Sequence, residues 1–379
     1  MNSKIRLGIL GGGGDSLIGV LHRIAAAMFD NYRITGGVFN PVWDENIGFA
    51  EKIGLPANRI YKDLDTLIAE ELKLPLAERM QVISVLTPNF LHFPMAKKLL
   101  QNGFHVICEK PMTTRYEEAI ILQKTSRLAN TVFAVTYTYT GYPMIRQMRR
   151  MIAEGVIGKV QKMDAQYYQG WINPFIHDKE KRSTVWRLDP KKGGISCCVG
   201  DIGTHAFNML EYVTQLKIRS VLADLNYVYS DNEMDVDGTI LLRAENGVKG
   251  VICTSQIASG EENSFIVKIY GDRAGLKWEQ ENPNYLYLME DGQPLRVLKP
   301  GHSYNSELSL SGTKLPPGHP EGIFDAMGNI YKGVAKAIKK EPYDPGEFPT
   351  MIDGVRGMNF IEKVIESHQK ENSWIPLNE

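Results

Sequence analysis

The segment Gly200–His205 holds the residue types best suited to chemistry in this chain. Asp201 and His205 are four residues apart, so on a helix they would share one face, about 6 Å apart along the axis. Histidine is the natural general base near neutral pH, and a carboxylate beside it raises its basicity. The same pair could cap a helix beside a buried histidine or join a metal site, but no third ligand of suitable spacing is evident. Flanking glycines, which let a ligand come close, favour a proton-transfer site.

Lys110 is a second candidate for chemistry, in the sequence Glu109-Lys110-Pro111 directly after the apolar run His105–Cys108. A lysine at the end of a buried strand can hydrogen-bond a substrate hydroxyl and favour its alkoxide character during hydride loss. A solvated surface lysine is the ordinary alternative. A polar loop also follows the run Val82–Leu86, where a proline turn before a helix would explain the same residues. Because ligands bind at the carboxyl ends of parallel strands, this loop is a candidate cofactor contact through Thr87, Pro88, Asn89 and His92.

The first apolar run stops at four successive glycines, Gly11–Gly14, ahead of a segment of helical periodicity. Glycine lets the backbone approach phosphates, and free amides with the helix dipole offset their charge, so this turn predicts a dinucleotide site. Ser16 stands where the third glycine of G-x-G-x-x-G belongs, and the next glycine is Gly19. The cofactor contacts expected here are Gly11, Gly13, Leu17 and Ile18.

The end of the second apolar run bears on the choice between NAD and NADP. An acidic residue there binds the ribose 2′-hydroxyl and repels a 2′-phosphate. This chain has Asn40, with Asp44 four residues later and no arginine between Asn40 and Asn58. The pattern favours NAD, while Lys52 or Arg59 could still bind the phosphate of NADP.

Aromatic and basic residues in the second half are candidates for substrate binding. Trp186 and Arg187 could supply a sugar-stacking ring and a hydroxyl or phosphate donor, or form an interface tryptophan beside a solvated arginine. Tyr139 and Tyr142 could line a polar pocket, although aromatic residues at strand spacing more often pack.

The elements that must position these residues alternate between strands and helices in the first third of the chain, which predicts a doubly wound parallel sheet. After about residue 139 the pattern becomes rich in strands separated by turn signals, which predicts a mostly antiparallel sheet with helices. The expected division is a Rossmann domain over residues 1–139 and an α+β substrate-binding and oligomerisation domain over residues 140–379. The expected strands are Ile5–Leu10, Ile34–Phe39, Val82–Leu86, His105–Cys108, Thr131–Val135, Val160–Tyr168, Ser220–Tyr229, Gly238–Ala244, Val248–Gln256, Phe265–Tyr270 and Leu286–Glu290.

Composition excludes several classes of function. Forty-three basic and 44 acidic residues in 379 leave a net charge of −1, so nucleic-acid binding is not expected as the main function. No apolar run approaches the roughly 20 residues of a membrane span. The four cysteines show neither CxxC spacing nor a disulfide pattern. We therefore expect a reduced, soluble, cytoplasmic protein.

Taken together, the glycine turn and the motifs TPNFLH, CEKPMT and GDIGTH resemble the Gfo/Idh/MocA oxidoreductase family over nearly the whole chain. The stretches GGGGDSLIGVLHR, TYTYTGYPMIRQ, VWRLDP and GDIGTHAFNMLEYVT look most like the branch of levoglucosan and glycoside 3-dehydrogenases. The segment GHPEGIFDAMGNIYKG, with His319 and Glu321, is similar to one in sugar-active members, which makes His319 a further substrate candidate.

The resemblance implies an NAD(P)-dependent sugar or cyclitol dehydrogenase that forms dimers or tetramers through its second sheet. Lys110 would bind the reacting hydroxyl, His205 would take its proton, and Asp201 would hold His205 or a sugar hydroxyl in register, with no metal required. Glu109 and Lys110 would also contact the cofactor. The levoglucosan-like branch oxidises the C3 hydroxyl of a pyranose.

Two other functions occur on the same fold. One is a galactose-regulon corepressor that binds a dinucleotide without chemistry, which the presence of Lys110, Asp201 and His205 disfavours. The other is a glycosidase that uses NAD transiently and needs the same site, so the motifs do not separate it from a dehydrogenase.

Overall fold

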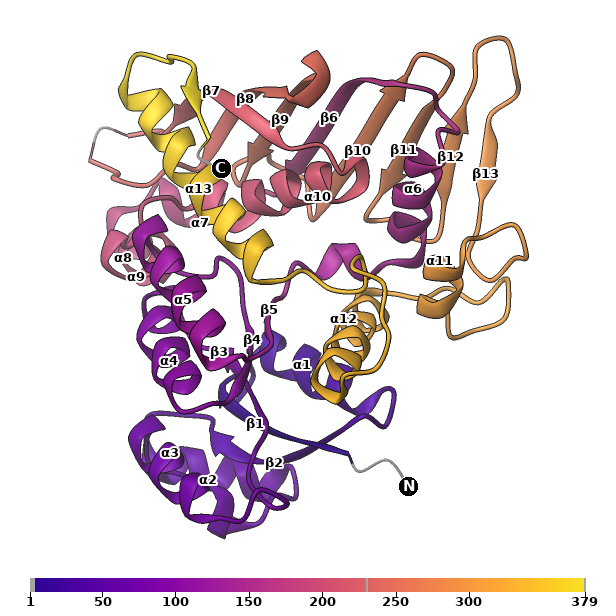
Figure 1. Ribbon diagram of the computed structural model, residues 1–379. Helices are drawn as coiled ribbons and strands as arrows, with labels where there is room; N and C mark the ends of the chain where they lie inside the picture. Colours follow the sequence, from indigo (N-terminus) through magenta and orange to yellow (C-terminus); the bar gives the residue numbers. More distant parts are fainter. Residues whose placement is uncertain (1–3, 230, 378–379) are drawn as a thin grey trace.

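The computed structural model describes residues 4–229 and 231–377 and contains two sheets, one above the other in Figure 1. The first sheet has five parallel strands, which confirms the parallel sheet that the alternating pattern predicted. The strand order is β2-β1-β3-β4-β5. The strand order reverses between β1 and β3, where doubly wound sheets bind ligands. Its strands are β1 (Ile5–Gly11), β2 (Tyr32–Val38), β3 (Val82–Leu86), β4 (His105–Cys108) and β5 (Phe133–Val135).

Helices connect the strands of the first sheet. Two of them, α2 and α3, had not been predicted, because α2 buries only Asn46 and Ala50 and shows little apolar periodicity. The connecting helices are α1 (Leu17–Ala27), α2 (Trp43–Lys52), α3 (Leu64–Lys73), α4 (Asn89–Gln101) and α5 (Tyr116–Ala129), with a 3-10 turn over Ala57–Arg59.

The second sheet has nine strands in the order β13-β12-β11-β10-β6-β9-β8-β7-β14. Its neighbouring strands are antiparallel except β6 and β9, which run parallel, so the mostly antiparallel prediction is confirmed. Three short strands were missed, since each offers at most five residues of pattern: β11 (Gly275–Glu279), β13 (Arg296–Leu298) and β14 (Ile375–Pro376). The others are β6 (Val160–Tyr168), β7 (Ile218–Asn226), β8 (Asp237–Ala244), β9 (Lys249–Ser255), β10 (Ser264–Gly271) and β12 (Leu286–Met289).

Long helices cover the face of the second sheet that looks toward the viewer in Figure 1. Helix α10 packs on β6 and β10 and against α6 and α13, so the residues of its first turn lie over the middle of the sheet. The helices are α6 (Pro143–Ala153), α10 (Thr204–Thr214), α11 (Glu307–Gly312) and α13 (Met351–Gln369). Shorter elements are η2 (Thr138–Gly141), α7 (Asn173–Ile176), α8 (Lys179–Thr184), η3 (Trp186–Leu188), α9 (Pro190–Gly193), the π-helical turn η4 (Val199–Gly203) and η5 (Glu245–Gly247).

Helix α12 (Ile323–Lys339) belongs to the second half of the chain but packs on α1 of the first sheet (Figure 1). Met327, Ile330, Tyr331 and Val334 are buried in the same core as the residues of β1 and α1. The division at residue 139 stays a prediction, and within it α12 is the helix that crosses back to the first sheet.

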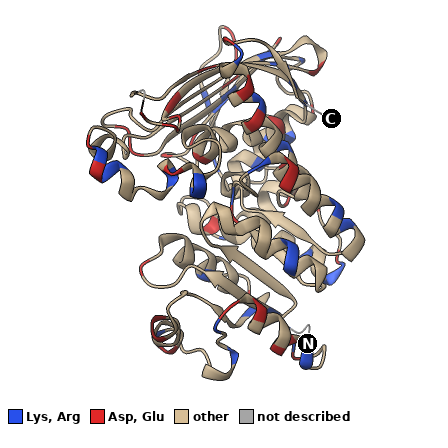
Figure 2. Cartoon of the chain, turned by 90° about the vertical axis from the view of Figure 1, so that its left-hand side faces the viewer, with Lys and Arg blue, Asp and Glu red and all other residues tan. Residues whose placement is uncertain are grey.

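Charged residues of both signs are interspersed along the outer helices in Figure 2, as the net charge of −1 suggests. Across residues 4–229 and 231–377, none of the helices combines the length and apolar character that crossing a bilayer demands.

Candidate functional site

The glycine turn after β1 opens into a cavity of about 630 Å³. The end of β2 and the loop after β3 form the other walls, which places the cavity at the reversal of strand order. Five of the predicted cofactor residues line it: Gly11, Gly13, Asn40, Thr87 and Pro88. Sequence reasoning missed Leu64, Phe90, Leu91 and Met95, because neither their types nor their spacing signals a ligand. It also missed Lys62 and Asp63, a cation and an anion in the wall near the end of β2.

The geometry of the turn fits a dinucleotide pyrophosphate. A Cβ on Gly13 would lie 2.7 Å from the carbonyl oxygen of Phe39, so the backbone of the turn approaches β2 more closely than a side chain permits. A Cβ on Gly19 would lie 1.8 Å from the carbonyl oxygen of Gly12, so Gly19 gives helix α1 the close approach usually provided by the third glycine. Ser16 instead caps the helix, since its Oγ accepts the amide of Gly19 at 3.2 Å.

The side chains near the end of β2 favour NAD. Asn40 accepts the amide of Val42 at 2.9 Å and donates to the carboxylate of Glu45 at 2.6 Å, which brings an acidic group to the position where this chain lacks an aspartate. Arg59 is held by Glu71 through bonds of 2.9 and 2.8 Å, so its guanidinium is committed to another partner.

The other predicted cofactor residues lie outside the lining of this cavity. Leu17 is exposed at the start of α1 beside Ile18, and His92 is buried in α4, where it bridges the carbonyl oxygens of Thr87 and Pro111 at 2.7 and 2.9 Å. Asn89 donates to the carbonyl of Gly193 at 3.0 Å. The side chains of His92 and Asn89 therefore connect the loops around the site to one another.

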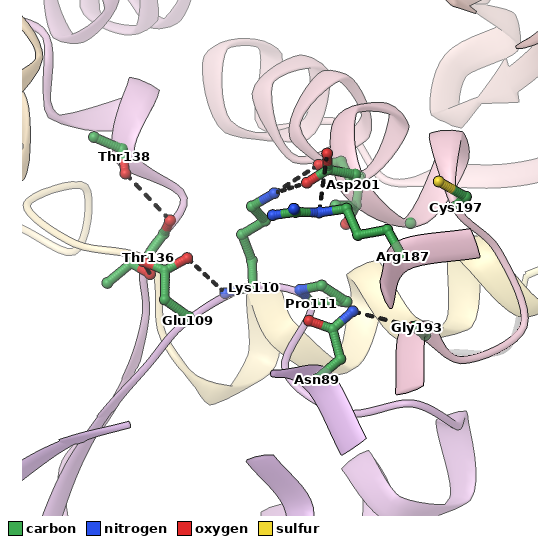
Figure 3. A network of polar contacts seen from close by, with 12 residues as sticks. Asn89, Glu109, Lys110, Pro111, Thr136, Thr138, Arg187, Gly193, Cys197 and Asp201 are labelled. Carbon is green, nitrogen blue, oxygen red and sulfur yellow. Dashed lines mark hydrogen bonds and ion pairs between the residues drawn. The ribbon is translucent and has the colours of Figure 1, made fainter. Parts of the chain in front are cut away.

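Lys110 and Asp201 meet between the two sheets (Figure 3). The Nζ of Lys110 donates to Asp201 Oδ1 at 2.6 Å and to its carbonyl oxygen at 2.9 Å. Gln256 donates to Oδ2 at 2.9 Å, and Arg187 Nε lies 3.5 Å from the same atom. Burial alone would raise the pKa of the Asp201 carboxyl, but the charges of Arg187 and Lys110 and the hydrogen bond from Lys110 hold it well below its usual value.

A buried carboxylate fixes the turn that carries Asp201. Asp235 accepts the amide of Cys197 at 2.9 Å and that of Val199 at 2.8 Å, and Ser196 Oγ accepts the amide of Gly200 at 2.9 Å. Asp235 lies 36 to 38 residues away in sequence, so no local pattern indicated this role.

His205 is buried in the first turn of α10, and its Nδ1 has no hydrogen-bond partner among the residues that the structure describes. Its ring packs edge-on against Tyr139 at 4.8 Å and Tyr137 at 5.7 Å. Burial and the charge of Lys110 lower its pKa to about 3, and Asp201 and Glu109 offset this only in part.

Two expectations about the Asp201–His205 pair are therefore corrected. The carboxylate of Asp201 bonds to Lys110 and Gln256 rather than to His205, because the π-helical turn directs it toward the first sheet. The histidine is also less basic than expected, since desolvation outweighs its attraction to the carboxylate.

The tyrosines fall into two groups. Tyr139 shares a hydrogen bond of 2.5 Å with Tyr167, whose hydroxyl donates to Asn263 at 2.7 Å, so this pair forms a polar patch beside His205. Tyr142 is 2% exposed and stacks on Tyr139 with ring centroids 6.4 Å apart, which makes it a packing residue.

Arg187 closes the site from the second half of the chain. Its guanidinium lies 4.5 Å from the ring of Trp186 and 5.9 Å from that of Trp171. The cavity left beside it measures about 10 Å³, room for about one water. Its walls are Asn89, Lys110, Arg187, Gly193, Ser196, Cys197 and Asp201.

His319 is not brought to either cavity. It is exposed in the loop before α12, and its Nδ1 lies 3.1 Å from the carbonyl oxygen of Pro316. Within the described part of the chain, no group of three His, Cys, Asp or Glu residues is arranged to hold a metal ion.

Comparison with known proteins matches both halves of the chain. Residues 5–137 match the oxidoreductase family with an NAD-binding Rossmann fold, and residues 145–277 match the GFO/IDH/MocA C-terminal domain. The uncharacterized oxidoreductase YfiI of Bacillus subtilis is 30% identical over 99% of this chain and 97% of its own. The levoglucosan dehydrogenase of Pseudarthrobacter phenanthrenivorans is 24% identical over 79% of this chain and 80% of its own.

Solved structures give the same result. An inositol dehydrogenase homolog from Azotobacter vinelandii, complexed with NAD⁺, superimposes with a TM-score of 0.92 at 31% identity, covering 99% of this chain and 98% of that one. Its complex with NADH and myo-inositol superimposes with a TM-score of 0.90 at 30% identity over the same shares.

Proposed function

The chain belongs to the Gfo/Idh/MocA family of oxidoreductases and carries that family's NAD-binding Rossmann domain, and from this we propose that it is an NAD-dependent dehydrogenase of a sugar or cyclitol hydroxyl. The observation that carries the proposal is the meeting of Lys110 with Asp201, 2.6 Å apart, between the glycine-turn cavity and His205. Gly11, Gly13 and Asn40 would hold NAD in the cavity at the glycine turn, where it would supply an acceptor for the hydride that leaves the substrate carbon. The protein must supply a donor to the hydroxyl oxygen and an acceptor for its proton.

Lys110 donates to the reacting hydroxyl and stabilises negative charge as it develops on that oxygen. Asp201 anchors the Lys110 ammonium and leaves its other oxygen, now bonded to Gln256, to accept from a neighbouring substrate hydroxyl. His205 takes the hydroxyl proton on its ring. The lowered pKa keeps the ring neutral at physiological pH, and because it lies below the pH that suits a general base, bound substrate must raise it for efficient proton transfer.

The proposed substrate is a neutral cyclic polyol. The name of one relative is levoglucosan dehydrogenase, and one structural neighbour is complexed with NADH and myo-inositol. Both compounds carry a ring of secondary hydroxyls. Tyr139, Tyr167 and Asn263 offer polar groups beside His205 for such a ring, while Arg187 and Trp186 cover it. Following the levoglucosan resemblance, the C3 hydroxyl of a pyranose is the proposed reacting position.

The second sheet supports a proposal of homodimers or homotetramers. Buried and exposed residues alternate along β8, which marks one packed face and one face open to solvent. Leu241 on that open face is 42% exposed. An uncovered sheet face can pack against the sheet of a second copy of the chain.

The testing experiment measures NADH absorbance with purified protein, NAD and a panel of glucose, myo-inositol, levoglucosan and simple glucosides. We expect NADH to accumulate with at least one of them and the signal to fall about 10²–10⁴-fold in His205→Ala. His302→Ala, which changes a histidine that stacks on Tyr304 outside the site, is the matched control.

Absence of NADH across the panel, with NAD binding confirmed, would contradict a dehydrogenase of these substrates. Release of free sugar from the glucosides without net NADH would instead indicate the glycosidase chemistry of the same fold.

A further inference from the structure

A buried chain of hydrogen bonds runs from helix α12 to the residue before Lys110. His22 of α1 is fully buried, and its Nε2 lies 2.8 Å from Glu109 Oε1. Its Nδ1 lies 2.7 Å from the hydroxyl of Tyr331, which lies 2.8 Å from Ser84 Oγ. The hydrogen bonds of His22 and Tyr331 therefore join α1, α12, β3 and the end of β4, and the catalytic proposal does not use this histidine.

The chemistry of these groups determines which of them donates and which accepts in each hydrogen bond. An ionised carboxylate only accepts, so His22 must carry a proton on Nε2 to bond Glu109. A neutral ring then has a bare Nδ1, which accepts from the Tyr331 hydroxyl, and Ser84 donates to the oxygen of Tyr331. Every group is satisfied by one tautomer, in the way that a hydrogen bond to one ring nitrogen sets the other.

At the other end of this hydrogen-bond network, Glu109 fixes the turn that starts at Lys110. Thr136 Oγ1 donates to Glu109 Oε1 at 2.5 Å, and the backbone amide of Lys110 lies 3.3 Å from Oε2. Burial alone would raise the pKa of Glu109, but hydrogen bonds from His22 and Thr136 and the charge of Lys110 lower it. The carboxylate is therefore ionised and bonded on both sides, and it was not found among the walls of the cofactor cavity.

We propose that His22, locked in one tautomer by Tyr331, is a positioning residue that holds the Glu109 carboxylate and with it the backbone from which Lys110 reaches Asp201. The inference rests on the proposed role of Lys110. It adds that helix α12, from the other half of the chain, takes part in placing that lysine. Misplacement of a reacting group by about 1 Å lowers rates about 10²-fold, so the effect is measurable.

Tyr331→Phe is the sharpest variant, because it removes one hydroxyl and keeps the ring that packs edge-on against His22 and Tyr32. We expect kcat to fall about ten- to hundredfold with the Kd for NAD unchanged. Tyr32→Phe is the matched control. It removes a buried hydroxyl that donates to the backbone oxygen of Tyr331 at 2.7 Å but lies outside the chain, so kcat should stay within twofold, about the scatter expected of a neutral change.

A pH profile separates positioning from a general loss of stability. Weakening the His22 bond removes an interaction that lowers the Glu109 pKa, so the acid limb of kcat/KM should move to higher pH in Tyr331→Phe and not in Tyr32→Phe. The charged and titratable groups that act on or respond to Glu109 are His22, His92, Cys108, Lys110, His205 and Tyr331, and each is unchanged in the control.

A readout independent of turnover keeps this test distinct from that of the proposed function. An amine-reactive reagent followed by peptide mass spectrometry should label Lys110 severalfold faster in Tyr331→Phe than in the natural protein or in Tyr32→Phe. The single variant His22→Gln can still donate to Glu109 and accept from Tyr331, so its Lys110 should be labelled as slowly as in the natural protein. In His22→Leu, which can do neither, labelling of Lys110 should be fast.

Equal labelling and equal kcat in Tyr331→Phe and Tyr32→Phe would overturn the proposal. A natural protein that turns over no substrate would count against the proposed function alone, since the labelling comparison still reads the position of Lys110.

Discussion

The cavity beside the glycine turn measures about 630 Å³, whereas the cavity between Lys110 and Asp201 measures about 10 Å³. The first is lined mostly by apolar side chains around a glycine turn, in which Gly13 and Gly19 bring main-chain atoms closer than any side chain allows. The second is shaped by charged side chains, which close on one another through Lys110, Arg187 and Asp201. The half at the glycine turn is thus open, whereas the half around Lys110 is closed. Under the proposed function, a substrate exchanges the ion pairs of the closed half for contacts of its own.

Because the two halves differ in this way, substitutions in one half should have different effects from substitutions in the other. Backbone geometry determines whether the cofactor binds, so damage there should appear as a change in affinity. Under the proposed function, the ion pairs around Lys110 act on a bound substrate, so damage there should appear as a change in turnover.

Lys110→Met gives the largest expected effect. The variant loses the donor to the reacting hydroxyl, so kcat/KM should fall about 10³-fold, the size seen when one such donor is removed. The Kd for NAD, measured by fluorescence titration, should change less than about twofold, well under the tenfold that corresponds to 1.4 kcal/mol. Lys191→Met, at an exposed lysine, is the control. Normal turnover in Lys110→Met would break the comparison, because the closed half would then not be catalytic.

Gly13→Ala should give the opposite pattern. Its Cβ would lie 2.7 Å from the carbonyl oxygen of Phe39, so the turn must shift and the Kd for NAD should rise about tenfold or more, equivalent to about 1.4 kcal/mol. At saturating NAD, kcat should be nearly restored. Gly48→Ala, where an added methyl group meets nothing within 4 Å, should bind NAD normally. Equal Kd values for the two variants would show that the turn does not hold the cofactor.

The dryness of the closed half can be measured without substrate. The pKa of His205 is lowered from 6.5 to about 3, so the unfolded chain binds a proton that the folded chain refuses, and stability from this group is full above pH 6.5 and lost as pH falls toward 3. In His205→Phe the free energy of unfolding should change less steeply between pH 4 and 6, by up to about 1.4 kcal/mol per pH unit. Urea denaturation at several pH values measures both slopes, and parallel slopes would contradict a desolvated histidine.

The smallest effect is expected at the edge of the open half. Glu45 is held beside Asn40, so Glu45→Gln should raise the affinity for NADP relative to NAD about fivefold by removing one exposed, partly screened charge near the 2′ position. Asp44→Asn removes the same charge from the neighbouring residue and should leave the ratio of Kd values unchanged. An equal shift in both variants would indicate general charge rather than a placed carboxylate.

Much of this site follows from local sequence. Residues at the ends of strands, such as Thr87 and Lys110, were predicted because a short apolar run locates the end of a parallel strand and all such ends meet at one edge. The parallel character of the first sheet and the presence of a second, mostly antiparallel sheet followed from the same periodicities, whereas the strand order came only from the structure.

Other features of the site could not be predicted from the sequence, because they depend on contacts between distant strands and on a local change of helix type. Gln256 and Asn263 reach the site only through the placement of β9 and β10 beside β6, and Asp235 acts on amides from another segment. The spacing of Asp201 and His205 suggested a pair, but the π-helical turn between them sends the carboxylate to Lys110. The spacing of two residues in the sequence tells whether they share one face of a helix only when the type of helix is known.

The return of α12 to the first sheet also has a consequence for the order in which the protein matures at the ribosome. Strands β1 to β5 are complete once residue 135 has been synthesised, yet Met327, Ile330 and Tyr331, which cover α1, emerge only after most of the second sheet. Until then the apolar flank of the first domain and His22 face water. A nascent chain stalled before α12 should therefore be digested by protease within its first domain more readily than a chain in which α12 has emerged.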